Sequence, residues 1–426
     1  MRQIRGSRFL IIASLFVVAG LVLAACGGGS SSSSSSESGS AGEGGESSSS
    51  GSGSTVKVTS IADETGPTAS TQVPYVAGLK GGFEVYNSEL SGSQHKIEVE
   101  YNDDKYETAP GLAAYKKAES DGSLVSIGPN ASDTQPAIVK AGMEIPLVSA
   151  LTTTLLEEPM IWNTLPTFAD QAKIMVNAAA KNQKGAKLKV AGLYYEVASG
   201  VEFNEALQAA TEEIGGEFVG GVPIALEEVT GTWRTQAQKL AELEPTFIGV
   251  LSSAGDPQVF LPAIANAGLE NVEVGGVTPL GLYKENWTKV PKALGEKFFV
   301  TSSISPADFG TEGAAEVEEA AKSQGEPEYA NNLYFVQGFV IAKLVAEAIN
   351  NAGEEPTPED VNTALSEING FEAGGLNPPL CFSKTDHYGT GLARPIKFNL
   401  KAQKFEPIGE FSEWEKYLST PEGGSC

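Results

Sequence analysis

The chain has 426 residues and a formal net charge of −25, because 54 acidic side chains outnumber 29 lysines and arginines. So acidic a protein is a poor nucleic-acid binder, and anionic lipid surfaces repel it. It contains only two histidines and three cysteines, and they do not cluster with the spacing of a metal site, so we expect neither a metal nor another cofactor.

The N-terminus has the pattern of a secretory signal. Three arginines precede an apolar run over residues 9–23, and small residues stand directly before Cys26. At about 15 residues, this run is shorter than a typical transmembrane helix. The pattern resembles a bacterial lipobox, whose cysteine thiolate is nucleophilic enough to take up a lipid. We predict a signal peptide over residues 1–26 and lipidation at Cys26, which anchors the protein on the outer face of the cytoplasmic membrane.

Residues 27–54 are nearly all glycine and serine. Such a segment cannot bury a core, and as a flexible coil it reaches about 30 Å, so we interpret it as a disordered tether. The remaining chain, residues 55–426, exceeds what a single hydrophobic core usually supports. We therefore expect it to form two lobes.

Strand-like and helix-like segments alternate from Thr55 onward. Strands are predicted at Thr55–Ile61, Lys96–Tyr101, Leu124–Gly128, Ile145–Ala150, Leu188–Tyr194, Phe247–Leu251, Val272–Gly275 and Phe298–Ser302. Helices are predicted at Val73–Leu90, Tyr106–Ser120, Thr134–Gly142, Pro166–Asn182, Ser199–Ile214, Gln236–Leu243, Pro257–Ala267, Ala314–Ser323 and Leu333–Asn350. The C-terminal part adds strands at Ile396–Asn399 and Phe405–Ile408 and a helix near Ser412–Leu418. This alternation predicts an α/β fold with parallel sheets and helices on both faces.

Short polar loops follow several predicted strands, each just before a predicted helix. They span residues 128–132, 151–154 and 252–255. Open α/β sheets bind ligands at the carboxyl ends of their strands, where hydroxyls and free helix N–H groups suit a carboxylate or another acceptor. Helix capping alone explains any single loop, but their recurrence at strand ends indicates a binding site.

Marks of a known family then run through the domain in order. They are Thr65-Gly66-Pro67, Gly78, Asn87, Tyr101-Asn102-Asp103-Asp104, Gly128, Thr134-Gln135-Pro136, Ile145-Pro146-Leu147-Val148-Ser149 and Ala267-Gly268-Leu269. Each mark is weak alone, whereas their order and spacing together are specific. Residues 55–426 resemble the type I solute-binding proteins of ABC importers, in the leucine/isoleucine/valine-binding branch.

The resemblance implies two Rossmann-like lobes joined by three hinge crossings, with the ligand cleft between them. The crossings are expected near Thr164–Phe168, Ser302–Pro306 and Leu376–Cys381. Lobe 1 would comprise residues 55–165 and 304–377, and lobe 2 residues 166–303 and 378–426. Ligand binding closes such lobes by a hinge motion. A membrane permease then recognises the closed form, so the expected partners are a small-molecule ligand and ABC permease subunits, with the binding protein itself a monomer.

The resemblance also carries over pocket positions in the first lobe. Ala131 or Ser132 falls at one place where the family holds the ligand carboxylate, and a one-residue gap leaves either open. Thr152 and Thr153 fall at the second such place, and the hydroxyl is kept there.

The second lobe departs from the family pattern. Ser199 and Ser253 stand where the family has two pocket tyrosines, and Val277 aligns with the acidic residue that pairs with the ligand ammonium. Asp256 is a nearby substitute for that acid. Four further side chains are candidates for a reshaped wall, although aromatic residues in such positions more often belong to the core: Trp233, Arg234, Tyr283 and Trp287. Because an ammonium buried without a carboxylate is costly, the sequence predicts a small polar solute, amino-acid-like, amide or carboxylate, and weak binding of branched-chain amino acids.

Three alternatives differ in class. An enzyme is disfavoured, because the sequence has no Gly-x-Ser-x-Gly elbow, no P-loop and no histidine beside a plausible nucleophile. A sensor lipoprotein that signals to a membrane receptor would have the same cleft and differ only in its partner. A purely structural surface lipoprotein would show no stabilisation by ligand.

Two cysteines remain after Cys26 is lipidated. Exported proteins most often pair two such residues, so we predict a disulfide between Cys381 and Cys426.

Overall fold

The computed structural model describes residues 54–92, 94–149, 155, 157–183, 187–228, 231–252, 257–277 and 290–412. All of them belong to one compact unit over Ser50–Cys426. The predicted signal peptide with Cys26, the Gly/Ser tether up to residue 53, the C-terminal helix and Cys426 lie outside the described residues. Within the described part the chain alternates strands and helices in two lobes, which confirms the predicted α/β fold class.

The described residues of the first lobe form a five-stranded parallel sheet in the order β2-β1-β3-β4-β5. Its strands are β1 (Thr55–Ala62), β2 (Lys96–Asp103), β3 (Ser126–Ile127), β4 (Leu147–Ser149) and β5 (Ile161–Asn163). β1 and β2 pair from Thr55 opposite Lys96 to Ala62 opposite Asp103. Because parallel strands end at the same edge, the loops after β1 and β2 lie side by side.

The described residues of the second lobe form a seven-stranded sheet in the order β14-β13-β10-β9-β8-β6-β7. Its strands are β6 (Lys189–Tyr195), β7 (Glu217–Ile224), β8 (Phe247–Leu251), β9 (Glu273–Val277), β10 (Phe298–Ser302), β13 (Arg394–Asn399) and β14 (Lys404–Pro407). The strands from β6 to β10 run parallel, whereas β13 and β14 join antiparallel at one edge. A separate antiparallel pair is formed by β11 (Asn369–Phe371) and β12 (Leu380–Cys381).

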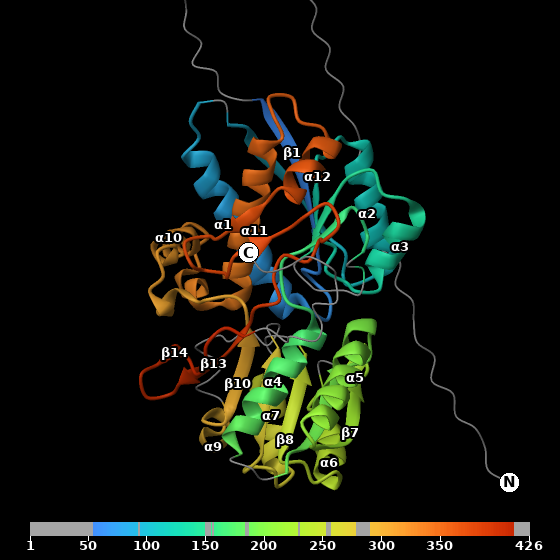
Figure 1. Ribbon diagram of the computed structural model, residues 1–426, viewed down its shortest axis with the longest axis vertical. Coiled ribbons are helices and arrows are strands. Elements are labelled where there is room, and N and C mark those ends of the chain that lie inside the picture. The colour runs from blue at the N-terminus through green and yellow to red at the C-terminus, as the bar shows by residue number, and fades with distance from the viewer. Residues whose placement is uncertain are drawn as a thin grey trace, which may run out of the picture. The chain divides into compact units, whose positions relative to one another are not determined.

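Helices cover the sheets. They are α1 (Ala69–Ser88), α2 (Thr108–Ser120), α3 (Thr134–Ala141), α4 (Phe168–Asn182), α5 (Ala198–Glu213), α6 (Arg234–Glu242), α7 (Pro257–Asn266), α9 (Lys292–Gly295), α10 (Ala314–Ser323), α11 (Leu333–Asn351) and α12 (Pro358–Ser366), with 3₁₀ turns η1 (Leu226–Glu228), η3 (Ala307–Phe309) and η4 (Pro327–Asn331). Figure 1 shows α4 and α5 lying against the seven-stranded sheet and α11 beside α1. Among the described helices, only α11 is long and apolar enough to cross a membrane, and most of it is buried in the core.

Two glycines allow α1 and α11 to approach closely. A Cβ atom added to Gly78 would lie 2.0 Å from the carbonyl oxygen of Phe335, and one added to Gly338 would lie 2.1 Å from that of Tyr75. Any larger residue would force the helix axes apart. Gly78, one of the family marks in the sequence, therefore has a packing role.

The chain passes between the two sheets after β5, after β10 and between β12 and β13. The last passage lies beyond the Leu376–Cys381 segment expected from the sequence, because β12 pairs with β11 and the chain enters the seven-stranded sheet only at Arg394. The exact lobe boundaries stay a prediction.

The first and third passages are hydrogen-bonded to one another. Asn163 donates its N–H to the His387 carbonyl and accepts the Gly389 N–H, both at 2.9 Å. The Tyr388 hydroxyl donates to Asp170 at 2.7 Å and accepts the Thr167 N–H at 3.1 Å. The third passage is thus tied to the first turn of α4.

Candidate functional site

Strand ends of both sheets line one small cavity of about 40 Å³. Its described lining residues are Thr68, Thr71, Gln72, Tyr106, Phe168, Tyr195, Val197, Ser199, Leu251, Ser252 and Tyr334. A cavity of this size holds only a few water molecules, so the two walls stand close together. Loop residues 151–154, with Thr152 and Thr153, and residues 253–256, with Ser253 and Asp256, lie outside the described residues.

The start of α1 forms part of the first-lobe wall. Asp63 is buried and accepts hydrogen bonds from the Gly66 N–H, the Thr68 N–H at 2.7 Å and the Thr68 hydroxyl at 2.8 Å. The Thr71 hydroxyl in turn donates to the Thr68 carbonyl at 2.7 Å. A Cβ atom at Gly66 would lie 2.5 Å from the Lys105 carbonyl oxygen, so only glycine lets the two neighbouring loops approach this closely.

The loop that was expected to carry the first pocket position lies just behind this wall. Asn130 donates from Nδ2 to Oε1 of Gln72 at 2.9 Å, and Gln72 lines the cavity. Ala131 and Ser132 are buried but are not among the described lining residues. The loop therefore supports the cavity through its neighbours.

Tyr106 is a lining residue that the sequence did not suggest. It follows Lys105, and both residues have left-handed backbone, with φ of 61° and 55°. The N–H of Lys105 donates to Asp103 and that of Tyr106 to Asp104, each at 3.0 Å. Burial raises the pKa of the Tyr106 hydroxyl to about 12.

The second-lobe wall comes from the ends of β6 and β8. Tyr195 ends β6, and Val197 and Ser199 follow at the start of α5. A Cβ atom at Gly200 would lie 1.9 Å from the Tyr195 carbonyl oxygen, so glycine is required where α5 begins against the strand. Ser252 follows β8, and its buried hydroxyl has no hydrogen-bond partner in the described structure.

None of the described lining residues carries a formal charge at neutral pH. Val277, which aligns with the family's acidic residue, is fully buried at the end of β9 in a hydrophobic cluster with Met175 and Phe299. It does not belong to the described cavity wall. The wall instead combines hydroxyl and amide groups with four aromatic rings. The described residues contain no group of three or more His, Cys, Asp or Glu side chains that could hold a metal ion.

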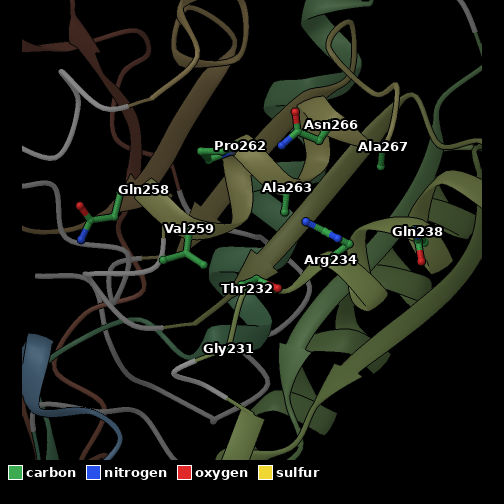
Figure 2. A pocket seen from close by; sticks show the side chains of 10 residues that line it. All are labelled: Gly231, Thr232, Arg234, Gln238, Gln258, Val259, Pro262, Ala263, Asn266 and Ala267. Carbon is green, nitrogen blue, oxygen red and sulfur yellow. The ribbon is translucent and has the colours of Figure 1, made fainter.

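Two further candidates lie elsewhere. Trp233 stacks on Phe260, with ring centroids 5.8 Å apart, and belongs to the core. Arg234 lies in a larger groove of about 630 Å³ lined by α6 and α7, which Figure 2 shows. That groove shares no described lining residue with the cavity. Tyr283 and Trp287 lie outside the described residues.

Buried charged side chains lie where α4 packs against α5. Asp170 and Lys173 are both buried, and their charged atoms lie 3.9 Å apart. Burial lowers the pKa of Lys173 to about 8, although Asp170 and glutamates of α5 oppose this. Burial also raises the pKa of Glu202 to about 7, helped by the charge of Asp170.

Two α/β lobes whose strand ends face a shared cavity define the class of the type I solute-binding proteins. The sequence profile of the periplasmic binding protein family matches residues 55–399, and the chain therefore belongs to that family. This confirms the resemblance seen in the sequence. No curated protein matches the chain significantly.

Solved structures share the fold. A branched-chain amino acid ABC transporter protein from Thermus thermophilus with bound valine is 20% identical, with a TM-score of 0.75 over 88% of this chain and 100% of that one. A fatty acid ABC transporter substrate-binding protein from Thermomonospora curvata is 21% identical, with a TM-score of 0.72 over 86% and 95%. A solute-binding protein from R. palustris in complex with benzoate is 18% identical, with a TM-score of 0.69 over 85% and 98%.

Proposed function

We propose that this protein captures a small polar solute without a charged amine in the interlobe cavity and delivers it to an ABC permease. The observation that carries the proposal is the uncharged wall, contributed by both lobes of a periplasmic binding protein fold. Hydroxyl and amide groups from Thr71, Gln72, Ser199 and Ser252 offer both donors and acceptors to a carboxylate or an amide. The aromatic rings cover the apolar part of such a solute.

The described cavity wall has no charged group opposite its hydroxyls, and this restricts the class of solute that it can bind. A plain α-amino acid would bury its ammonium against a wall with no described carboxylate. Leaving a charge unpaired in a closed cleft costs several kcal/mol, roughly what separates micromolar from millimolar affinity. The related structures bind valine and benzoate, so proteins of this fold take chemically different small molecules.

Delivery requires the protein to stand outside the membrane that holds the permease. The family implies an extracytoplasmic location, and lipidation at Cys26 would keep the protein at that surface. We propose no enzymatic activity, because the described cavity wall offers neither a carboxylate pair nor a histidine beside a nucleophile.

A solute screen followed by calorimetry tests the proposal. A solute that binds only the folded domain raises stability by mass action, about 2.7 kcal/mol at a hundredfold excess over Kd. We expect stabilisation by small amides or carboxylates, and no micromolar binding of leucine, isoleucine or valine. A micromolar Kd for any of these three amino acids would refute the ligand class, and the absence of stabilisation by any solute would refute the function.

Ser252→Ala provides the matching site variant. The Ser252 hydroxyl is buried without a described partner, so we expect it to donate to the solute, and its loss should weaken binding by about 1–3 kcal/mol. Ser366→Ala, at the half-buried last residue of α12, should leave affinity unchanged. Equal affinity of Ser252→Ala and the unaltered protein would exclude Ser252 as a contact. Co-purification with permease subunits tests the delivery step, and co-purification with a membrane receptor would instead indicate a sensor.

A further inference from the structure

Tyr388 is hydrogen-bonded on both sides of the first passage between the sheets. The two residues that flank it exchange backbone hydrogen bonds with Asn163, the last residue of β5, both at 2.9 Å. Its side chain reaches beyond the passage, where the hydroxyl accepts the Thr167 N–H at 3.1 Å and donates to Oδ2 of Asp170 at 2.7 Å. One residue thus joins the end of a first-lobe strand to the first turn of α4 in the second lobe.

The partners of the Tyr388 hydroxyl are buried with it. Tyr388, Thr167 and Asp170 all lie in the interior. Burial, together with the charge of Asp170, raises the pKa of the Tyr388 hydroxyl well above its usual value, so the hydroxyl stays protonated and donates at neutral pH. A hydrogen bond to a buried carboxylate is stronger than one between neutral groups. Breaking it would leave Asp170 with one partner fewer in the interior, which is costly.

Phe168 stands between the two partners of Tyr388 in the sequence. It is the first residue of α4 and lines the solute cavity. Thr167 and Asp170 are also bonded to each other, because the Thr167 hydroxyl accepts the Asp170 N–H at 3.0 Å and donates to its carboxylate at 2.5 Å. These two bonds fix the shape of the turn. The bonds of Tyr388 fix the turn to a segment that lies 221 and 218 positions later in the chain.

We propose that Tyr388 is a positioning residue of the solute cavity, whose hydroxyl holds the first turn of α4, and with it the Phe168 ring, in the cavity wall. The inference rests on the proposed solute-binding function and adds the third passage to the parts of the chain that shape its site. A rotation of the lobes about the first passage must either move the Tyr388 side chain with the helix or break its buried hydrogen bonds. Tyr388 itself is not among the described lining residues, so it acts through Phe168.

Fluorine NMR of para-fluorophenylalanine, incorporated at position 168 alone, tests this without a bound solute. Tyr388→Phe keeps the aromatic ring and removes only the hydroxyl. We expect the resonance to move by more than its linewidth or to split, because the first turn of α4 loses both bonds to the third passage. Titration with propanamide, a small amide of the proposed solute class, should show roughly threefold to tenfold weaker binding, the equivalent of about one hydrogen bond.

Tyr115→Phe is the matched control. Tyr115 is buried on α2, and its hydroxyl donates to the Ile145 carbonyl at 2.5 Å, so this variant also loses a buried hydrogen bond. Tyr115 belongs to a different hydrophobic cluster from Phe168. The control should therefore lower stability without moving the fluorine resonance or changing the binding of propanamide. If Tyr388→Phe does not fold, Asp170→Asn replaces it, since it removes the charge from the same hydrogen bond.

An unmoved resonance in the folded variant overturns the inference, because a purely structural role of the hydroxyl predicts lower stability alone. An equal change of the resonance in Tyr115→Phe overturns it as well, as does measurable propanamide binding that Tyr388→Phe leaves unaltered. The fluorine signal needs no solute. If no solute stabilises the unaltered protein, the proposed function fails, and the NMR comparison still decides this inference.

Discussion

Two carboxylates behind the cavity wall act on different backbone segments. Asp63 accepts three hydrogen bonds within its own loop, from Gly66 and Thr68. Asp103 joins that loop to the next one through Thr65 and Lys105. With these hydrogen bonds made, both carboxylates hold the loops that carry lining residues, and neither side chain is part of the described cavity wall. The described wall is therefore uncharged although the chain is strongly acidic.

Residue types at strand ends were predictable from the sequence, but contacts between loops were not. The serine-rich loop after β8 was expected from its place between a strand and a helix, whereas Ser199 was expected from the family resemblance alone. Ser199 and Ser252 line the cavity. Tyr106 was missed because its place depends on two successive residues with left-handed backbone, which leave no local sequence signal.

Glu202→Gln should reduce the dependence of stability on pH. The folded-state pKa of Glu202 is about 7, raised from 4.5 chiefly by burial. Between these values the folded protein keeps a proton that the unfolded chain releases. The free energy of unfolding therefore falls as pH rises from about 4.5 through about 7, and is level with respect to this group above that range. The unfolding free energy of Glu202→Gln should fall less over this pH range, because the carboxyl group of Glu202 no longer contributes.

Denaturant unfolding at about pH 5 and about pH 8 measures the difference. Asp104, whose pKa is raised to about 6, also lowers the free energy of unfolding as pH rises, by a smaller amount. The variant keeps this contribution. Glu212→Gln, on the exposed side of α5, should behave like the unaltered protein. A fall in Glu202→Gln as steep as in the unaltered protein would contradict this account.

At the scale of elements, uninterrupted apolar or periodic segments were predictable, whereas very short or interrupted ones were not. α10, β8 and β10 have the bounds that the sequence predicts. β5 was missed because three residues show no period, and β7 because glycines and a proline interrupt its apolar pattern. α12 was also missed, although its capping box at Thr357 and Asp360 is a readable start signal.

Gly338→Ala tests the packing of α1 against α11. The added methyl group would lie 2.1 Å from the Tyr75 carbonyl oxygen, which is backbone and cannot swing aside. Overpacking of this kind costs about 1–3 kcal/mol, and we expect at least that loss of unfolding free energy. Asn351→Ala, at the exposed end of α11, should stay within about 0.5 kcal/mol of the unaltered protein. Equal stability of Gly338→Ala and Asn351→Ala would show that the helices move apart freely.

The predicted disulfide would restrain the C-terminal region. Cys381 is disulfide-bonded in β12, but Cys426 lies outside the described residues, so the pairing between them stays a prediction. It would close a loop of roughly 45 residues and stabilise the folded state by about 4 kcal/mol in the chain-entropy model. Thiol titration of the denatured, unreduced mature domain should find no free thiol from this pair. Two free thiols would contradict the prediction, and reduction should lower the unfolding midpoint.

At the scale of the whole molecule, membrane attachment depends on the N-terminal cysteine. A net charge of −25 gives the chain no electrostatic affinity for anionic lipid. Cys26→Ala should therefore release the protein from the membrane or leave it unprocessed, as cell fractionation and immunoblotting would show. Ser30→Ala in the tether is the matched control and should remain attached. A Cys26→Ala protein found membrane-bound in the processed form would refute the lipid anchor.

The order in which the chain is made has a consequence for how the first lobe is completed. All strands of its described sheet have been synthesised once Asn163 is reached, but α11, which covers α1, begins only at Leu333. The second sheet waits longer still, for β13 and β14. A nascent chain thus presents the apolar side of α1 without its cover for most of synthesis, and exposed surface of this kind promotes aggregation. A fragment ending before Leu333 should be insoluble, and the chain should need to be kept unfolded until its last strands have emerged.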